Sequence, residues 1–344
     1  MVGVVYRIKS KGFSVCEVRE GSCKKSKVKF PEAIAAAELF KSHGNLDMII
    51  DKKDSKFLKG GFSQGKVIGA RIDVLPDGTK LNKAYSLFAP KLTIHDEKSK
   101  SHWDAIFENP NGKFAYLYTV NKMKLSKKAK YKRVAEFSKC LPKLKKNLMK
   151  AVDSDELVLP MLILLKTKMR VGNEIYYLKN HHKGLTTLKK KNISISGNRI
   201  TFDYIAKDGV PQKITEEFSA KVVNKLKSVL KTKKSGNFVF VDPNGHPLKD
   251  IVFEQAFEKY CGKKFYPHIV RSHYATDKAE KFLKGKRKIL KNEAEEFYLE
   301  IARKLGHKKF SKKNGWEDSY QVTLHHYIQP ELVEKIEKLI ISDA

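Results

Sequence analysis

The sequence predicts an α+β protein, with a small, mostly β N-terminal domain and a larger, mainly α C-terminal domain that holds a three-stranded antiparallel sheet. Short strand-like runs separated by turn residues dominate residues 1–124. Apolar residues at helical spacing dominate residues 125–344. With 344 residues, 41% of them hydrophobic, the chain is long enough for two domains that each bury a core.

The N-terminal domain is expected to begin with three strands and a helix. The strands are predicted in the runs VVYRI, FSVCEV and KVKF. The helix is predicted from Pro31 to Gly44, because proline favours the first turn of a helix and glycine the position after its end. Further short strands are predicted up to Thr119, with hairpin turns at Asp77-Gly78 and Asn111-Gly112.

The C-terminal domain is expected to be mainly helical. A Lys-rich linker is predicted near residues 121–131, and helices in 133–152, 153–170, 219–234 and most of 250–306. Turns at Gly197-Asn198 and Asp208-Gly209 divide residues 192–218 into a three-stranded meander. A strand with a turn is predicted in the run NFVFVDPNGHPL.

The charge of the chain predicts a polyanionic partner. Lys and Arg number 70 against 38 acidic residues, a formal net charge of +32 at pH 7. Nucleic acid is the expected partner of such an excess. The sequence offers no signal peptide, lipidation motif, basic amphipathic anchor or apolar run of membrane-spanning length. We therefore expect an intracellular location with DNA and no membrane partner.

The cysteines are few and scattered. They are Cys16, Cys23, Cys140 and Cys261, and they form no C-x-x-C pairs. A structural zinc site is therefore not expected, and so few cysteines in a chain of this length suit a reducing compartment.

Side chains suited to binding and attacking a phosphate recur at predicted turns and helix ends of the C-terminal domain. They are Arg170, Lys207, His268, Arg271, His307 and Tyr327. Taken singly, each has an ordinary structural explanation, such as a helix-capping charge, an exposed hairpin lysine or a packed tyrosine. Taken together, they supply the groups that one reaction on a phosphate requires.

The chemistry of that set is transfer of a phosphodiester. Two arginines grip the oxygens of one phosphate, and a histidine donor adds stabilisation where charge develops. A tyrosine supplies a nucleophile for a covalent intermediate, and a lysine on a turn can protonate the leaving oxygen. Such a site needs neither a metal nor a nucleotide, so no cofactor is expected.

The order and local context of these residues resemble those of the type IB DNA topoisomerases, particularly the small enzymes of poxviruses and other large DNA viruses. The resemblance covers nearly all of the C-terminal domain and is closest in KMRVGNEIYYLKNHHKGLTTLKKKNISI. It continues in the segments YIAKDGV, HIVRSHYA, KLGHKK and HHYIQP. It implies the catalytic fold that topoisomerases IB share with tyrosine recombinases.

The resemblance also implies a mechanism and a partner. Tyr327 would attack one strand of duplex DNA to give a 3′-phosphotyrosyl link, and supercoils would relax by rotation before resealing, without ATP or metal. Arg170, Arg271 and His307 would stabilise the transition state, while Lys207 would protonate the 5′-oxygen. A monomer would form a clamp around supercoiled DNA, in a virion or infected-cell cytoplasm if the source is viral. Further DNA contacts are expected from His268, Tyr176, Lys189, Lys190 and Lys191.

Three alternatives stay open at the level of sequence. Tyr320, inside the Lys-rich segment that separates His307 from Tyr327, is a second candidate nucleophile. His268 stands where the poxvirus-type enzymes tend to carry lysine, and histidine there is typical of tyrosine site-specific recombinases. A non-enzymatic DNA-binding protein would use the fold and the charge alone.

Overall fold

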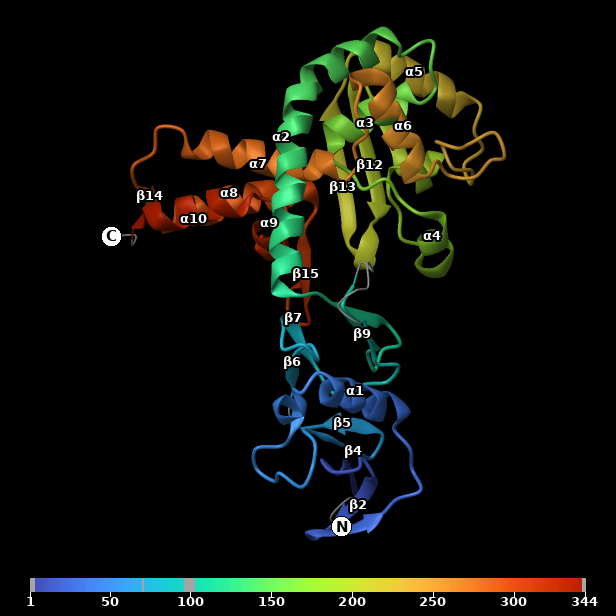
Figure 1. The fold of residues 1–344 in the computed structure, drawn as a ribbon. Coiled ribbons are helices and arrows are strands. Elements are labelled where there is room, and N and C mark those ends of the chain that lie inside the picture. The colour runs from blue at the N-terminus through green and yellow to red at the C-terminus, as the bar shows by residue number, and fades with distance from the viewer. Residues whose placement is uncertain (1–3, 70, 96–102, 342–344) are drawn as a thin grey trace. The chain divides into compact units, whose positions relative to one another are not determined.

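The computed structural model describes residues 4–69, 71–95 and 103–341 (Figure 1). The chain divides into two compact units, Met1–Ala129 and Lys130–Ala344. The α+β class is confirmed, with a β-rich N-terminal unit and a mainly helical C-terminal unit that holds a three-stranded sheet. Within the described residues, no helix is both long enough and apolar enough to cross a membrane.

Among its described residues, the N-terminal unit has three small antiparallel sheets. The five-stranded sheet has the order β3-β2-β1-β4-β5, and the others pair β10-β9-β8 and β6-β7. The strands are β1 (Val5–Ile8), β2 (Val15–Arg19), β3 (Ser22–Lys25), β4 (Gly61–Ser63), β5 (Lys66–Ile68), β6 (Ile72–Val74), β7 (Lys80–Tyr85), β8 (Thr93–Ile94), β9 (Ala105–Glu108) and β10 (Phe114–Leu117). The predicted turns at Asp77-Gly78 and Asn111-Gly112 are confirmed, since they join β6 to β7 and β9 to β10.

The predicted helix of the N-terminal unit is confirmed as α1 (Pro31–Ser42). Its buried residues Ala33, Ala36, Ala37 and Phe40 lie on one face and join a core with strand residues such as Ile8 and Tyr85. The prediction of a strand in the run KVKF, residues 27–30, is wrong. The third strand is β3, because the turn at Glu20-Gly21 folds the chain straight back onto β2.

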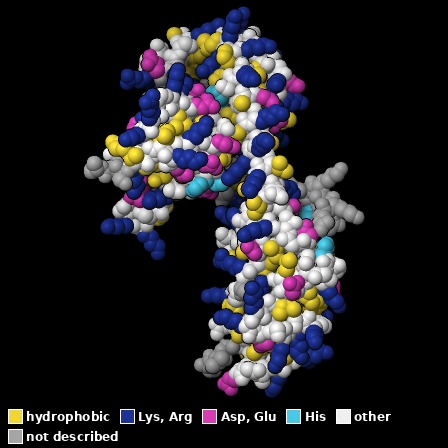
Figure 2. All heavy atoms as spheres, turned by 60° about the vertical axis from the view of Figure 1, so that its left-hand side comes forward, with side chains coloured by type: hydrophobic (Ala, Val, Ile, Leu, Met, Phe, Trp, Pro, Cys, Tyr) yellow, Lys and Arg dark blue, Asp and Glu magenta, His cyan; other side chains and the backbone are white. Residues whose placement is uncertain are grey.

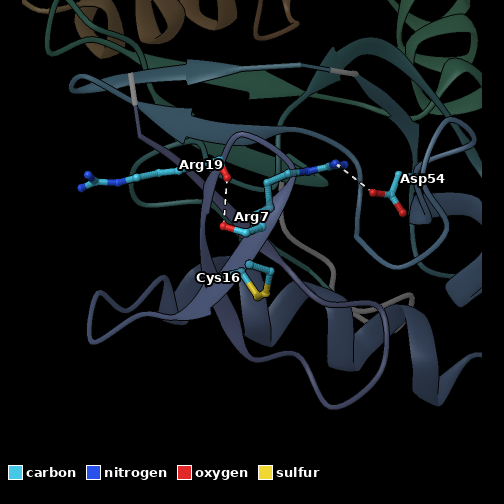
Figure 3. The surroundings of a disulfide bond; sticks show 6 residues. Arg7, Cys16, Arg19 and Asp54 are labelled. Carbon is cyan, nitrogen blue, oxygen red and sulfur yellow. Dashed lines mark hydrogen bonds and ion pairs between the residues drawn. A yellow bond between two sulfur atoms is a disulfide. The ribbon is translucent and has the colours of Figure 1, made fainter. Parts of the chain in front are cut away.

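A disulfide joins Cys16 of β2 to Cys23 of β3, with 5.4 Å between the Cα atoms (Figure 3). The tight turn brings together two cysteines that are seven positions apart in the sequence. The structure therefore pairs two of the four cysteines that are scattered in the sequence. Cys140 and Cys261 are free. Nearby, Arg7 forms ion pairs with Asp51 and Asp54.

Where a linker was predicted, the structure has a helix. Residues 121–131 lie within α2 (Val120–Lys150), which continues through Pro142. The lysine-rich run forms a helix because lysine is a good helix former and because buried Tyr131, Val134 and Phe137 recur at helical spacing. The division between the two units therefore falls inside a continuous helix.

The predicted meander is confirmed as β11 (Ile193–Ser196), β12 (Arg199–Ile205) and β13 (Pro211–Glu217), paired in that order. Helix α3 (Val158–Thr167) packs on β13 and on helices α5 (Ala220–Lys231) and α6 (Asp250–Cys261). Buried residues such as Phe137, Leu164, Phe202, Leu226 and Phe257 form one core. The prediction of a strand in the run NFVFVDPNGHPL, residues 237–248, is wrong. Its prolines and the turn at Asn244-Gly245 leave only isolated bridges, Lys189 to Phe238 and Val241 to Pro247.

A second core of the C-terminal unit lies among its last helices. Helices α7 (Ile269–Leu283), α8 (Lys291–Leu305) and α10 (Pro330–Leu339) pack together, as Figure 1 shows in orange and red. Strands β14 (Ile289–Leu290) and β17 (Ile340–Ile341) pair beside them. The segment after His307 forms the hairpin β15 (Lys308–Ser311) and β16 (Gly315–Asp318), followed by α9 (Gln321–His326). This arrangement returns the chain to the second core at Tyr327 and Ile328.

Candidate active site

Tyr327 lies at the junction of two helices. It follows α9 directly, and its backbone N–H donates to the carbonyl of Thr323 at 3.0 Å. The Tyr131 hydroxyl donates to the carbonyl of Ile328 at 2.6 Å, and the Lys130 ammonium donates to that of His326 at 2.5 Å. Helix α2 thus holds the backbone on both sides of Tyr327, whose side chain is only 5% exposed.

His268 lies against the phenol of Tyr327. Its Nε2 is 2.8 Å from the tyrosine hydroxyl oxygen. Burial, together with the charges of Arg271, Arg170, Lys130 and Lys207, lowers the pKa of His268 to about 3. The ring is therefore neutral at physiological pH. If Nε2 is the unprotonated nitrogen, it can accept the proton of Tyr327.

Arg271, in the first turn of α7, is a buried cation held by neutral groups. Its Nη1 donates to the carbonyl of Lys168 at 2.6 Å, and its Nη2 donates to the carbonyl of Leu305 at 2.8 Å and to Nε2 of His307 at 2.9 Å. Its Nε is buried and has no partner among the described residues. Burial lowers the pKa of the guanidinium to about 10, which leaves it charged at neutral pH.

His307 follows Gly306 at the end of α8 and is buried beneath Tyr327. The two rings lie 4.7 Å apart between centroids. The Nδ1 of His307 is 2.7 Å from Oγ1 of Thr323. Burial, with Arg271 as the leading nearby charge, lowers the pKa of the imidazole to about 2, so that the ring is neutral. The backbone there is fixed by Gln212, which donates to the carbonyl of Gly306 at 3.1 Å.

Arg170 is positioned by a close crossing of two backbone segments. The carbonyl of Arg170 accepts from the N–H of Leu185 at 2.8 Å, and the N–H of Thr186 donates to the carbonyl of Val171 at 2.7 Å. A Cβ on Gly184 would lie 2.6 Å from the nitrogen of Gly172 and 2.7 Å from the carbonyl oxygen of Arg170, so only glycine fits. Arg170 itself is half-buried, and its charge lowers the pKa values of Arg271, His268 and His307.

Lys207 occupies the turn between β12 and β13. The turn includes Asp208 and Gly209 at φ +64° and +79°, and the Lys207 side chain is exposed. Its charge contributes to lowering the pKa of His268. The predicted lysine turn is therefore present, within electrostatic range of the cluster.

The structure brings together the residues singled out by the sequence to different degrees. Tyr327, His268, Arg271 and His307 form one contiguous cluster, and Arg170 and Lys207 act on it through their charges. Tyr320 instead packs against Tyr298, 5.7 Å between ring centroids, in the second core. The contacts of Lys130, Tyr131 and Thr323 at this site could not be predicted, because no spacing rule links helix α2 or an ordinary threonine to Tyr327.

The other predicted DNA contacts lie on or near the surface. Tyr176 is 64% exposed on the short helix α4 (Glu174–Asn180), next to the exposed Ile175 and Leu178. Lys190 and Lys191 lie in a 3₁₀ turn before β11, and the ammonium of Lys189 lies over the rings of Tyr177 and Phe238. Across residues 4–69, 71–95 and 103–341, no three His, Cys, Asp or Glu side chains are arranged to hold a metal ion.

Known proteins are similar to the part of the chain that holds the candidate active site. The family model described as eukaryotic DNA topoisomerase I, catalytic core, matches residues 120–337. The DNA topoisomerase 1B of Acanthamoeba polyphaga mimivirus is 25% identical over 241 residues, which cover 64% of this chain and 71% of that protein.

Two solved structures show weaker likeness. The XerH site-specific recombinase bound to its difH substrate has 17% identity and a TM-score of 0.34, with 50% of each chain covered. The Tn1549 transposon integrase in complex with circular intermediate DNA has 16% identity and a TM-score of 0.28, with 47% of this chain and 55% of the integrase covered. The chain thus spans about half the length of each of these structures.

The matched residues span the helices and the three-stranded sheet of the C-terminal unit. Because the family model matches well over half of the chain, the chain belongs to the DNA topoisomerase I family, as a type IB DNA topoisomerase similar to a viral enzyme.

Proposed function

We propose that this topoisomerase nicks one strand of supercoiled duplex DNA through a 3′-phosphotyrosyl intermediate at Tyr327, lets the duplex rotate, and reseals it without ATP or metal. The observation that carries the proposal is the state of Arg271. This buried guanidinium donates to two carbonyls and a neutral histidine and lies 5.1 Å from the centroid of the Tyr327 ring. Its Nε has no partner among the described residues. A buried charge without a counter-ion is costly, so the site favours a bound anion.

A phosphodiester is the anion that suits this site. Arg170 adds a second charge close enough to lower the pKa of Arg271. Two guanidinium groups can bind the two non-bridging oxygens of one phosphate. Tyr327 lies beside Arg271, with 5.1 Å from the guanidinium carbon to the ring centroid, and within hydrogen-bonding distance of His268. The cations, the nucleophile and a proton acceptor therefore lie in a single cluster.

In the cleavage step, the Tyr327 oxygen forms a bond to phosphorus as the bond from phosphorus to the 5′-oxygen breaks. The phenolic proton passes to Nε2 of His268, and Lys207 supplies a proton to the departing 5′-oxygen. Arg170, Arg271 and His307 stabilise the charge that develops on the phosphate oxygens. Resealing is the same step in reverse. One phosphodiester is exchanged for another, so no outside energy source is needed.

The surface supports duplex DNA as the partner. Figure 2 shows lysine and arginine side chains spread over the visible face of each unit. The N-terminal unit is proposed to complete a clamp around the duplex as part of a monomer. Tyr176 and Lys189–Lys191 are proposed to contact DNA. Binding through many phosphate contacts is expected to weaken steeply with added salt. The similarity to a mimivirus enzyme suits a site of action in a virion or infected cell.

The test uses negatively supercoiled plasmid in EDTA without ATP, with the wild-type chain, Tyr327→Phe and Tyr320→Phe. Relaxation is followed on agarose gels, and the covalent protein–DNA adduct is trapped with detergent. We expect wild type and Tyr320→Phe to relax the plasmid and form the adduct. Tyr327→Phe should bind DNA but do neither.

Other outcomes separate the rival functions. Loss of activity in Tyr320→Phe alone would assign the nucleophile to Tyr320. An adduct confined to one DNA site, without relaxation, would indicate a site-specific recombinase. DNA binding with neither relaxation nor adduct would leave a non-enzymatic DNA-binding protein.

A further inference from the structure

Thr323 links His307 to the segment that carries Tyr327. The threonine lies in α9 and is fully buried. Its Oγ1 is 2.7 Å from Nδ1 of His307, and its carbonyl accepts from the backbone N–H groups of Tyr327 at 3.0 Å and Ile328 at 3.3 Å. Thr323, which is not one of the predicted catalytic residues, is therefore hydrogen-bonded to the predicted catalytic residue His307.

The contacts of His307 fix its tautomer in the DNA-free protein. A guanidinium has N–H donors and no acceptor. Because Nη2 of Arg271 lies 2.9 Å from Nε2 of His307, this nitrogen must accept and carries no proton. The ring proton is then on Nδ1, which donates to Oγ1 of Thr323. In this state His307 has no N–H on its Nε2 side.

Stabilising a phosphate oxygen through Nε2 requires the opposite tautomer. Burial and the nearby charges of Arg271 and Arg170 oppose a doubly protonated ring, so that His307 stays neutral. Once Nε2 carries the proton, Nδ1 becomes an acceptor and needs a donor. A hydroxyl can accept in the first state and donate in the second. Thr323 can satisfy Nδ1 in both tautomers by rotation of its hydroxyl alone.

We propose that Thr323 is a positioning residue that supports His307 in both tautomers, so that when DNA binds and Arg271 turns its donor to the phosphate, His307 can donate to the same phosphate from Nε2. The inference rests on the proposed function of the site. Thr323 would thus belong to the active site without contacting DNA.

The test is a double-mutant cycle in the full-length protein, read as the rate of detergent-trapped adduct formation on supercoiled plasmid with protein in excess. Thr323→Val keeps the shape of the side chain and removes the hydroxyl. It should slow adduct formation roughly tenfold, the effect of losing one buried hydrogen bond, while DNA affinity in filter binding stays unchanged. Thr323→Ser keeps the hydroxyl and should stay close to wild type.

The cycle distinguishes action through His307 from a general structural role. In a His307→Ala background, Thr323→Val should cause no further slowing, because its effect runs through the missing imidazole. The same tenfold slowing in both backgrounds, or a Thr323→Val variant as fast as wild type, would overturn the inference and leave the proposed function standing. A wild-type protein that forms no adduct would overturn both.

Discussion

The Nε2 atom of His268 lies 2.8 Å from the hydroxyl oxygen of Tyr327, which makes this histidine a neighbour of the proposed nucleophile as well as a predicted DNA contact. Burial, with the charges of four basic residues, keeps its ring neutral by lowering its pKa to about 3. These residues are Arg271, Arg170, Lys130 and Lys207. A neutral imidazole beside a phenol is a suitable acceptor for the proton that leaves when Tyr327 attacks.

Replacing His268 with Gln removes the proton acceptor. We expect adduct formation to slow by about 100-fold, at the lower end of general-base effects. The rate in His268→Gln should rise with pH, because solvent hydroxide must then take the phenolic proton. In the wild-type protein, titration of His268 should not change the rate of adduct formation between pH 5 and 8, since the pKa of this residue is about 3. The measurement is single-turnover adduct formation across that pH range.

His325 provides the matched control for that experiment. It is exposed and lies two positions before Tyr327. His325→Gln should keep the rate and pH profile of wild type. A His268→Gln variant that keeps the wild-type rate would contradict the assignment of His268 as the proton acceptor.

Tyr131→Phe should both destabilise the C-terminal unit and slow cleavage. The variant loses the hydroxyl that donates to the carbonyl of Ile328, next to Tyr327. Loss of this buried hydrogen bond should cost about 1 kcal/mol in the free energy of unfolding, measured in urea. Adduct formation should slow, because the carbonyl that follows Tyr327 is no longer held by α2.

Tyr298→Phe is the control for the loss of a tyrosine hydroxyl. The hydroxyl of Tyr298 is also buried, but it has no hydrogen-bond partner among the described residues. Its removal should therefore leave stability unchanged or raise it, since an unsatisfied polar group is lost. Equal destabilisation by both variants would contradict the role given to the Tyr131 hydrogen bond.

Gly184→Ala should disturb Arg170 without touching its side chain. The backbone of Gly184 has φ −142°, which alanine adopts readily, so the cost arises from contacts alone. The added Cβ would lie 2.6 Å from the nitrogen of Gly172 and 2.7 Å from the carbonyl oxygen of Arg170. We expect a loss of about 1–3 kcal/mol in the free energy of unfolding, as for other overpacked sites, and slower cleavage.

Gly236→Ala is the matched control for that substitution. A Cβ at Gly236 meets nothing within 4 Å, so both stability and cleavage rate should stay as in wild type. Urea unfolding and adduct formation would be measured on both variants. A Gly184→Ala protein with wild-type stability and rate would show that the crossing of these segments does not position Arg170.

The sequence predicted the fold where local signals decide the structure. Pro31 and Gly44 bracket the helix that forms α1, and the turn dipeptides divide β11, β12 and β13 as expected. The predicted linker is wrong because a lysine-rich run is compatible with a helix when one face is apolar, and Tyr131, Val134 and Phe137 form that buried face. At this position the apolar spacing, and not the charge, determines the structure.

The candidate site was predicted as a set of residues, but not as a set of contacts. The hydrogen bond between His268 and Tyr327 joins residues 59 positions apart in the sequence. The hydrogen bond from Tyr131 to Ile328 joins residues 197 positions apart. Such contacts depend on how α2, α7 and α9 pack in three dimensions. A single sequence carries no spacing rule for them, so the roles proposed for His268, Tyr131 and Thr323 required the structure.

The two buried histidines of the site should make the protein sensitive to mild acid. Burial lowers the pKa of His268 from 6.5 to about 3 and that of His307 to about 2. Below pH 6.5 the unfolded chain therefore binds a proton at each position that the folded chain does not bind. The stability contributed by the neutral rings is fully present above pH 6.5 and falls as the pH is lowered toward the folded-state pKa values.

Each of these histidines should contribute a slope of up to about 1.4 kcal/mol per pH unit to the free energy of unfolding below pH 6.5. His268→Gln and His307→Gln should each reduce the acid slope in urea unfolding between pH 4.5 and 6.5. Some slope should remain in the double variant, because burial also lowers the pKa of His273. His246→Gln should leave the acid slope in place, since His246 is exposed and Glu174 raises its pKa. An acid slope unchanged in both site variants would mean that these imidazoles are not held neutral, and the proton acceptor proposed for Tyr327 would be lost with them.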